Sequence, residues 1–501
     1  MTATRGQDVL LARSGVRYAA LGSLLKTGSG IFLVVLLPPL LSRTLGPIHF
    51  AAWALCAELA GYLVLLETGM GNAVSSSVAP LGSVDAAAAT RRLIPLSLLF
   101  ASVAVGVAVI ISLLLPVILK TAPAALVAES QRTFLLLAAP SVAVVVMGAI
   151  SGFYASRQAN FVPGLGLFLG RALACIAVAV LSLQGAGMLE LAAVWAGLAS
   201  LPLLLLAAQF GLRWRAPSGI TTRVRRRVVA SSCGSYSAWA LAGFLIVGLD
   251  TSIVARHELP FVGVYAVAAS VLLVLQAAVS AALAPLLPRV AQAISANRAP
   301  EVVQELSFLV RLCGIGLGLA IAMLLVAPKI IIGLLSANAS ARAGTILTLL
   351  LLAGAIRLPM LPLSTALIAA LEHRRLIWLP MVEAGVNVTV SLALAPHYGA
   401  VGVAFGTLAG SIAGVLTTAL WAAPRLRRLP GVAPRMLLGA SGTALALAFL
   451  PVIPRLGAAA VPMNGIVISV STAALACASV GIAGYLLSLR WQQVRSLAKN
   501  G

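Results

Sequence analysis

Apolar runs of about 20 residues recur from one end of this chain to the other, and each is separated from the next by a short polar stretch. A run of that length crosses the hydrocarbon core of a bilayer, which is about 30 Å thick, as an α-helix. The pattern predicts fourteen transmembrane helices and leaves no segment for a soluble domain. The helices are predicted at residues 18–41, 50–69, 93–119, 133–156, 161–183, 190–212, 228–252, 261–287, 308–327, 344–371, 376–396, 400–423, 435–454 and 464–489.

The composition agrees with a membrane protein. Of the 501 residues, 61% are hydrophobic and 9% are charged, and the mean hydropathy is +1.07. Soluble domains carry about 25% charged residues. All five cysteines lie inside predicted helices, so we expect neither a disulfide framework nor a cysteine metal site. The expected fold class is an all-α polytopic membrane protein with about 14 transmembrane helices.

The basic residues are distributed unevenly between the two sides of the predicted helices. The formal net charge of +22 raises the question of nucleic-acid binding. However, 23 of the 34 Lys and Arg residues fall in loops on the side of both termini, seven fall in the opposite loops, and four lie within or at the edges of helices. Cytoplasmic loops carry such an excess of positive charge. We therefore expect both termini in the cytoplasm and no nucleic-acid partner.

A basic loop at residues 213–227 divides the chain after six predicted helices. Six helices return the chain to the cytoplasmic side, so two lobes of six helices would be parallel repeats. Transporters are often built from internal repeats, with the substrate site at the interface between the repeats. We expect an N-terminal lobe at 1–212, a basic cytoplasmic linker at 213–227, a C-terminal lobe at 228–423, and appended helices 13 and 14 at 424–501.

Two short segments support this internal repeat. GPIHFAAW opens helix 2 and LPFVGVY opens helix 8, each after a short outward turn. Ala51 and Trp53 of the first correspond to Gly263 and Tyr265 of the second, with an offset of 212 residues in both positions. Small residues and aromatics are also common at membrane interfaces, which is the alternative explanation.

Several ionisable residues lie within the predicted helices. Each such group costs at least about 2.5–3.5 kcal/mol on insertion scales and therefore suggests a functional role. A rise of about 1.5 Å per residue places Lys26 about 12 Å and Glu58 about 16 Å above the cytoplasmic edge, so the two could pair across the first hairpin. The residues are Lys26, Glu58, Glu67, Arg171, Asp250, Arg357 and Glu383.

Three cations at mid-depth suggest an anionic substrate. Lys26 and Arg171 belong to the first lobe and Arg357 to the second, and Lys and Arg are the natural partners of phosphate. We therefore interpret them as candidate substrate-binding residues. The alternative for each is packing, with Lys26 neutralised by Glu58 and Arg171 bonded to backbone carbonyls. RLPMLP, residues 357–362, places two prolines beside Arg357 and predicts an interruption of that helix.

The acidic residues are candidates for charge pairing or for coupling to an ion. Glu383 shares a helix face with Asn387, and it would either bind or exchange a coupling ion, H⁺ or Na⁺, or make a helix–helix contact. Glu58 and Asp250 are the other candidates, although Asp250 and Glu67 are expected near membrane edges that water can reach. We expect no resident cofactor, no metal site and no catalytic residue.

Three stretches carry a resemblance to a known family. Their matching features include Ser42-Arg43, Leu45-Gly46 and the run Glu67 to Ala73 in the first stretch, and Asp250, Gly263, Tyr265, Ala266 and Pro288-Arg289 in the second. The stretches are LLSRTLGPIHFAAWALCAELAGYLVLLETGMGNAV (40–74), LIVGLDTSIVARHELPFVGVYAVAASVLLVLQAAVSAALAPLLPRVA (245–291) and HYGAVGVAFGTL (397–408). They resemble the bacterial polysaccharide exporters of the O-antigen (Wzx-type) flippase family, in the superfamily of multidrug, oligosaccharidyl-lipid and polysaccharide exporters.

The resemblance implies a substrate and a location. Members of this family flip an oligosaccharide on a polyprenyl pyrophosphate carrier across the bacterial inner membrane by alternating access between two six-helix lobes. The implied partners are this lipid-linked oligosaccharide, membrane lipids, and the polysaccharide polymerase and chain-length proteins. Ala51 and Glu67 replace a Gly and an Asp that are common in the family. The buried cations vary between members, so no role is transferred to Lys26, Arg171 or Arg357.

Three other functions were weighed. A lipid II flippase would need the same cationic cavity. A cation-coupled multidrug exporter would favour an acidic cavity lined by aromatics, whereas this chain has three central cations and 5% aromatic residues. A membrane O-antigen polymerase or ligase would need a long outer loop, and the longest here, 120–132, carries no suitable constellation. The sequence therefore favours a transporter over an enzyme.

Overall fold

The computed structural model describes residues 36–452 and four isolated positions before them, with short gaps. Most of the predicted first helix, the whole of the predicted last helix, Lys26 and most of the basic linker lie outside the described residues. Two compact units make up the chain: unit 1 is Met1–Ser270 with Leu335–Ala337, and unit 2 is Val271–Leu334 with Asn338–Gly501. The isolated positions are 21, 22, 25 and 29, and the gaps are 79–80, 82, 158, 160, 214–225, 284–285, 287–289, 291–292, 295–297, 337–339, 371, 373–375 and 428.

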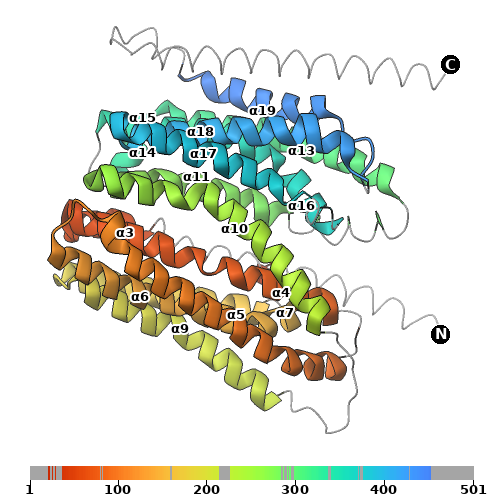
Figure 1. Ribbon diagram of the computed structural model, residues 1–501, viewed down its shortest axis with the longest axis horizontal. Helices are drawn as coiled ribbons and strands as arrows, with labels where there is room; N and C mark the ends of the chain where they lie inside the picture. Colours follow the sequence, from red (N-terminus) through yellow and green to blue (C-terminus); the bar gives the residue numbers. More distant parts are fainter. Residues whose placement is uncertain are drawn as a thin grey trace. The chain divides into compact units, whose positions relative to one another are not determined.

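Unit 1 is a bundle of helices in which many of the packed pairs are far apart along the chain (Figure 1). Helix α6 packs against α3, α5 and α9, while α4 packs against α7 and α10. The helices are α2 (Leu37–Thr44), α3 (Gly46–Tyr62), α4 (Leu65–Val78), α5 (Ser83–Ile118), α6 (Ala124–Val146), α7 (Gly148–Ser156), α8 (Phe161–Leu183), α9 (Met188–Arg213), α10 (Arg226–His257), the 3₁₀ turn η2 (Leu259–Phe261) and the start of α11 (Val262–Leu283).

Unit 2 is built around the pair α17 and α18, with α15 packed on α18 and α13 packed on α19. Its elements follow the end of α11. They are α13 (Ala299–Val326), α14 (Pro328–Leu335, whose last residue counts with unit 1), α15 (Ala341–Arg357), η3 (Leu358–Met360), α16 (Leu361–Ala369), α17 (Trp378–Tyr398), α18 (Ala400–Leu416), the π-helix η5 (Thr417–Ala422), η6 (Ala423–Arg425) and α19 (Pro434–Phe449).

The prediction of an all-α polytopic membrane protein is confirmed for the part of the chain that the structure describes. Every regular element there is helical. Eight helices are long and apolar enough to cross a membrane, or nine if the bent pair α6 and α7 forms one span. The total of about 14 spans remains a prediction. Apolar side chains such as Leu113 on α5 and Met323 on α13 are largely exposed, as expected where helices face lipid rather than water.

Several helices begin earlier than the apolar runs predict. The run at 93–119 belongs to α5, which begins at Ser83, and the run at 308–327 belongs to α13, which begins at Ala299. The added turns are polar and include Arg91, Arg92, Glu301 and Glu305. Hydropathy marks the part of a helix that suits the membrane, whereas backbone hydrogen bonding continues into water. By contrast, α8 spans the predicted 161–183.

In the part of the chain that the structure describes, breaks divide predicted helices 2, 4 and 10. Helix 2 is divided between α3 and α4, and helix 4 bends by 47° between α6 and α7 at Met147. Neither break coincides with a proline, so the pattern missed both. The break expected beside RLPMLP is confirmed, because α15 ends at Arg357 and a 3₁₀ turn precedes α16. Proline lacks the N–H needed to continue the hydrogen-bond ladder.

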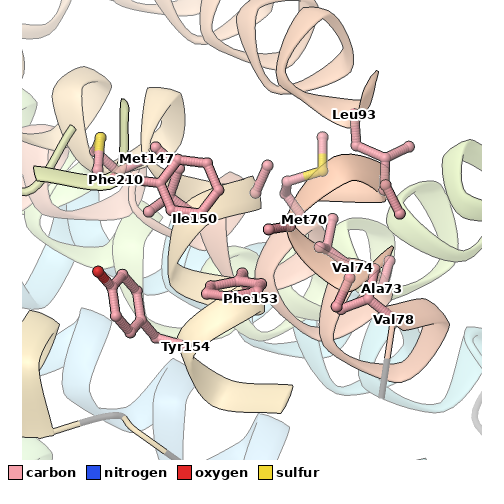
Figure 2. Packing of buried hydrophobic residues seen from close by; sticks show 14 of the residues in the cluster. Met70, Ala73, Val74, Val78, Leu93, Met147, Ile150, Phe153, Tyr154 and Phe210 are labelled. Carbon is pink, nitrogen blue, oxygen red and sulfur yellow. The ribbon is translucent and has the colours of Figure 1, made fainter. Parts of the chain in front are cut away.

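The core of unit 1 is formed where α4, α5, α7 and α9 meet (Figure 2). Phe153 packs edge-to-face on Tyr154 and on Phe210, with ring centroids 5.6 Å and 5.3 Å apart. Met70 and Leu93 are fully buried beside them. Lipid tails are as apolar as these side chains, so the close fit gains stability from van der Waals contacts rather than from removal of water.

A glycine on α8 allows this helix to approach α9. A Cβ atom on Gly170 would collide with the ring of Pro202 and lie 3.1 Å from the carbonyl oxygen of Leu198. One turn earlier, a Cβ atom on Gly166 would make an ordinary contact of 3.7 Å with the same proline. We expect Gly170→Ala to destabilise the protein by about 1–3 kcal/mol through overpacking.

The matched control is Gly166→Ala, which we expect to leave stability unchanged. Both effects are measured as the apparent Tm of the purified protein in detergent. Equal Tm values for the two variants would contradict the close approach of α8 and α9.

Candidate functional site

Arg357 joins three helices of unit 2 through its guanidinium group. It is the last residue of α15, and its Nε lies 3.6 Å from Oε1 of Glu383 on α17. Its Nη2 donates a hydrogen bond of 3.3 Å to Oε1 of Gln276 on α11. The two charged side chains are 19% and 12% exposed. The structure therefore brings together an arginine and a glutamate that the sequence suggested for separate roles.

The Arg357–Glu383 contact is loose for a buried ion pair. Charge-assisted N–H···O hydrogen bonds are about 2.7–2.9 Å long. The Oε1 atom of Glu383 is buried and accepts no hydrogen bond from the described residues. The pair therefore has charge balance without strong directional bonding.

A polar face on α17 continues from Glu383 along the helix. Asn387 and Ser391 follow at intervals of four residues, and all three side chains are buried. Ser391 Oγ donates to Oδ1 of Asn387 at 3.0 Å. This face packs on α18, whose glycines also recur every four residues. Cβ atoms on the last three of these glycines would collide with the polar face, and one on the first would collide with Leu394. The glycines are Gly402, Gly406, Gly410 and Gly414.

Arg171 is the candidate cation of unit 1. It lies on α8, and its Nη1 donates a hydrogen bond of 2.9 Å to Oγ of Ser29. Glu67 on α4 is close enough to act on Arg171 electrostatically. Within the described residues, Arg171 thus contacts a serine hydroxyl and experiences the charge of Glu67, while its roles in substrate binding or in packing both stay predictions.

Glu58 lies at the centre of a hydroxyl cluster in unit 1. Tyr62, one turn later on α3, donates to its Oε1 at 2.7 Å, and Thr251 on α10 donates to its Oε2 at 2.5 Å. Hydroxyl donors stabilise a carboxylate without neutralising its charge. The predicted partner, Lys26, lies outside the described residues, so that pairing stays a prediction.

Asp250 adds a second carboxylate to this cluster. It precedes Thr251 on α10 and accepts a hydrogen bond of 3.0 Å from the hydroxyl of Tyr265 on α11. The expectation that water reaches Asp250 and Glu67 is wrong, because they are only 1% and 2% exposed. Neighbouring helices of unit 1 pack against α4 and α10. The number of residues between a side chain and the end of its own helix does not reveal such packing.

The hydroxyl of Thr251 gives a direct test of this cluster. Thr251→Val keeps the side-chain shape but leaves Oε2 of Glu58 without its donor, so we expect a loss of about 1–3 kcal/mol in stability. Thr251→Ser retains the hydroxyl and serves as the control. Thermal unfolding in detergent measures both variants. A valine variant as stable as the serine variant would exclude the bond as a stabilising contact.

Sequence reasoning missed the neutral partners of the candidate charges. Gln276, Tyr62, Thr251 and Tyr265 carry no charge and are therefore not conspicuous in an apolar helix. The glycine repeat of α18 was visible as GVAFGTLAGSIAG, and its spacing of four residues is a known helix-packing signal. In the described part of the chain, no group of three His, Cys, Asp or Glu residues is placed to hold a metal ion.

Comparison with known proteins finds similarity to solved structures only. No family model and no curated protein matches the chain. Among solved structures, a mutant of the MATE transporter VcmN from Vibrio cholerae is 16% identical with a TM-score of 0.58, and the match covers 83% of this chain and 98% of that one. The lipid II flippase MurJ, in an inward closed conformation, is 11% identical with a TM-score of 0.57, covering 97% of this chain and 99% of that one. The chain has the MOP transporter fold.

A third MOP superfamily structure extends this comparison. A transporter from Pyrococcus furiosus, described by a reverse polarity of its binding pocket and a suggested different function, is 16% identical with a TM-score of 0.56. That match covers 83% of this chain and 96% of the other. Identities of this size show the shared fold alone, which is that of a multi-pass membrane protein.

Proposed function

We propose that this MOP transporter flips a polyprenyl-pyrophosphate-linked oligosaccharide, an O-antigen or exopolysaccharide repeat unit, across the bacterial inner membrane by alternating access. The observation that carries the proposal is Arg357, a largely buried guanidinium whose contacts to Glu383 and Gln276 are 3.6 Å and 3.3 Å long. A cation held this loosely is suited to exchange its carboxylate for a phosphate. Arginine can bind a phosphate through two parallel N–H···O hydrogen bonds. The carboxylate of Glu383, 3.6 Å from Arg357, makes no such pair of bonds.

Unit 1 supplies a comparable cation. Arg171 has a single serine hydroxyl at hydrogen-bond distance among its described partners, and Glu67 balances part of its charge. A hydrogen bond from a charged group contributes about 1.5–3 kcal/mol, and the charge-assisted bonds of a phosphate would replace that contribution. In the proposed cycle Arg171, Arg357 and, from the sequence, Lys26 contact the pyrophosphate during passage. These cations are assigned to the pyrophosphate and not to the oligosaccharide.

The extent of the structural matches favours a lipid-linked substrate. The match to the lipid II flippase covers 97% of this chain, whereas the matches to the MATE transporter VcmN and the Pyrococcus furiosus transporter cover 83%. The polysaccharide-exporter resemblance of residues 40–74, 245–291 and 397–408 favours an oligosaccharide over lipid II.

The test is deletion of the gene followed by complementation. We expect the deletion strain to lose surface polysaccharide and to accumulate lipid-linked repeats on the cytoplasmic face. Wild type and Arg171→Lys should restore export, while Arg171→Gln should reduce it about tenfold or more, which corresponds to about 1.4 kcal/mol of lost binding. Immunoblotting confirms equal protein levels. Unchanged polysaccharide in the deletion strain would exclude the proposal.

A cation-coupled multidrug exporter is the second candidate. The cluster of Glu58 and Asp250 with two tyrosines provides the carboxylates and aromatic rings that attract organic cations. If the deletion raises sensitivity to cationic dyes and leaves the polysaccharide intact, and if Glu58→Gln reproduces that sensitivity, this function replaces the first.

A further inference from the structure

An open groove lies in unit 2 at the end where α17 begins and the helix of α18 ends. Its volume is ≈ 680 Å³. Trp378, at the first position of α17, forms one wall, and four residues from the end of α18 and the following π-helix form the rest. Leu420 and Trp421 are 58% and 43% exposed. The lining residues are Trp378, Leu416, Thr417, Leu420 and Trp421.

Two features fix the shape of the groove. The rings of Trp378 and Trp421 meet edge-to-face, with centroids 4.4 Å apart and an angle of 90° between their planes. The backbone from Thr417 to Ala422 is a π-helix, a wider turn that is rare in proteins and often found at functional sites. The groove is therefore formed by a specific departure from regular helix, not by loose packing.

Arg425 places a positive charge at the rim. Its guanidinium lies 4.6 Å from the centre of the Trp421 ring, and its Nη1 donates a hydrogen bond of 2.7 Å to the Trp421 carbonyl. An arginine has five N–H donors. Among the described residues Arg425 uses one of them, and its side chain is exposed. The remaining donors are available to an anion in front of the tryptophan.

The charge of the surrounding chain is uniformly positive. Glu383 is the last acidic residue of the sequence, so residues 384–501 contain no Asp or Glu. Arg425 and Arg427 are exposed in the connection from α18 to α19, and Arg435 is exposed in the first turn of α19. The distribution of Lys and Arg predicts that this connection is cytoplasmic, where anionic lipid head groups attract basic residues near the surface.

We propose that this groove binds one anionic glycerophospholipid of the phosphatidylglycerol type. The phosphate lies against Arg425, and an acyl chain fills the apolar groove between the two tryptophans and the leucines. The tryptophans suit this position because their rings favour the boundary between head groups and hydrocarbon. The site is independent of the transported substrate.

The experiment measures quenching of tryptophan fluorescence by brominated lipids. The full-length protein is reconstituted in phosphatidylethanolamine vesicles that contain a minor fraction of brominated phosphatidylglycerol, or in vesicles in which only the phosphatidylethanolamine is brominated. We expect brominated phosphatidylglycerol to quench the tryptophan fluorescence more strongly than its mole fraction in the vesicles predicts. The variant Trp421→Phe should lose most of this additional quenching. Arg425→Gln should weaken the preference about fivefold, since a basic residue at the surface contributes about 1 kcal/mol.

The matched control is Arg427→Gln, which removes the same charge from the same connection, and this arginine contacts no tryptophan among the described residues. Preserved selectivity in Arg427→Gln and lost selectivity in Arg425→Gln would support the site. Equal losses in the two variants would indicate only a diffuse basic surface and would overturn it. Displacement of the brominated lipid by a polyprenyl phosphate but not by unlabelled phosphatidylglycerol would also overturn it, in favour of the carrier lipid.

Discussion

Replacing Glu383 by leucine is expected to lower the free energy of unfolding by about 3–5 kcal/mol, because removing one partner leaves the other charge buried and uncompensated. The charge left behind is the guanidinium of Arg357, for which Gln276 provides a single long hydrogen bond. Lipid cannot replace the carboxylate, since it offers no polar group at this depth. The measurement is the apparent Tm and the fraction of monodisperse protein in detergent.

The double variant Arg357→Met with Glu383→Leu separates packing from transport. Replacing a whole buried pair by apolar side chains of similar volume is often neutral or stabilising, so we expect the double variant to regain stability to within about 1 kcal/mol of the wild type. If Arg357 binds the substrate, this stable protein still fails to restore surface polysaccharide. Normal export by the double variant would show that the pair serves folding alone.

The position of the membrane-spanning helices was largely predictable, since the cost of placing polar groups in hydrocarbon acts on each segment separately. The run at 161–183 coincides with α8. The breaks after Tyr62 and at Met147 were not predictable, because no proline or charge marks them. Such breaks depend on how neighbouring helices pack, and the sequence of one segment alone does not show this packing.

The candidate site was predictable in its charges and not in its partners. A buried ion in an apolar run is conspicuous, so Arg357 and Glu383 stood out, and so did Glu58. Which side chains meet depends on the rotation of each helix about its axis and on its distance from its neighbours. The pairing of Arg357 with Glu383 across α15 and α17 is of this kind. The hydroxyl groups around Glu58 also depend on helix packing, since one of them belongs to α10, almost 200 residues further along the chain.

The double variant Gly406→Ala with Gly410→Ala is expected to lose most of the folded protein. A Cβ atom on Gly406 would collide with the hydroxyl of Ser391, and one on Gly410 would lie 2.8 Å from Cβ of Asn387 and 2.9 Å from the carbonyl of Glu383. Overpacking costs about 1–3 kcal/mol at each site, and here it falls partly on backbone, which cannot rotate away. Fluorescence-detected gel filtration of detergent extracts measures the loss.

The same two methyl groups bear on function through Glu383. Separation of α18 from α17 would move the polar face on which Glu383 lies, so surviving protein of a single variant, Gly410→Ala, should export less polysaccharide per folded molecule than the wild type. Gly385→Ala is the matched control, because a Cβ atom on this residue of α17 meets nothing within 4 Å. We expect its yield, Tm and export to equal those of the wild type. If Gly410→Ala behaves like Gly385→Ala, the glycine repeat of α18 does not set the distance between the two helices, and the alignment of Glu383 with Arg357 must depend on α15 instead.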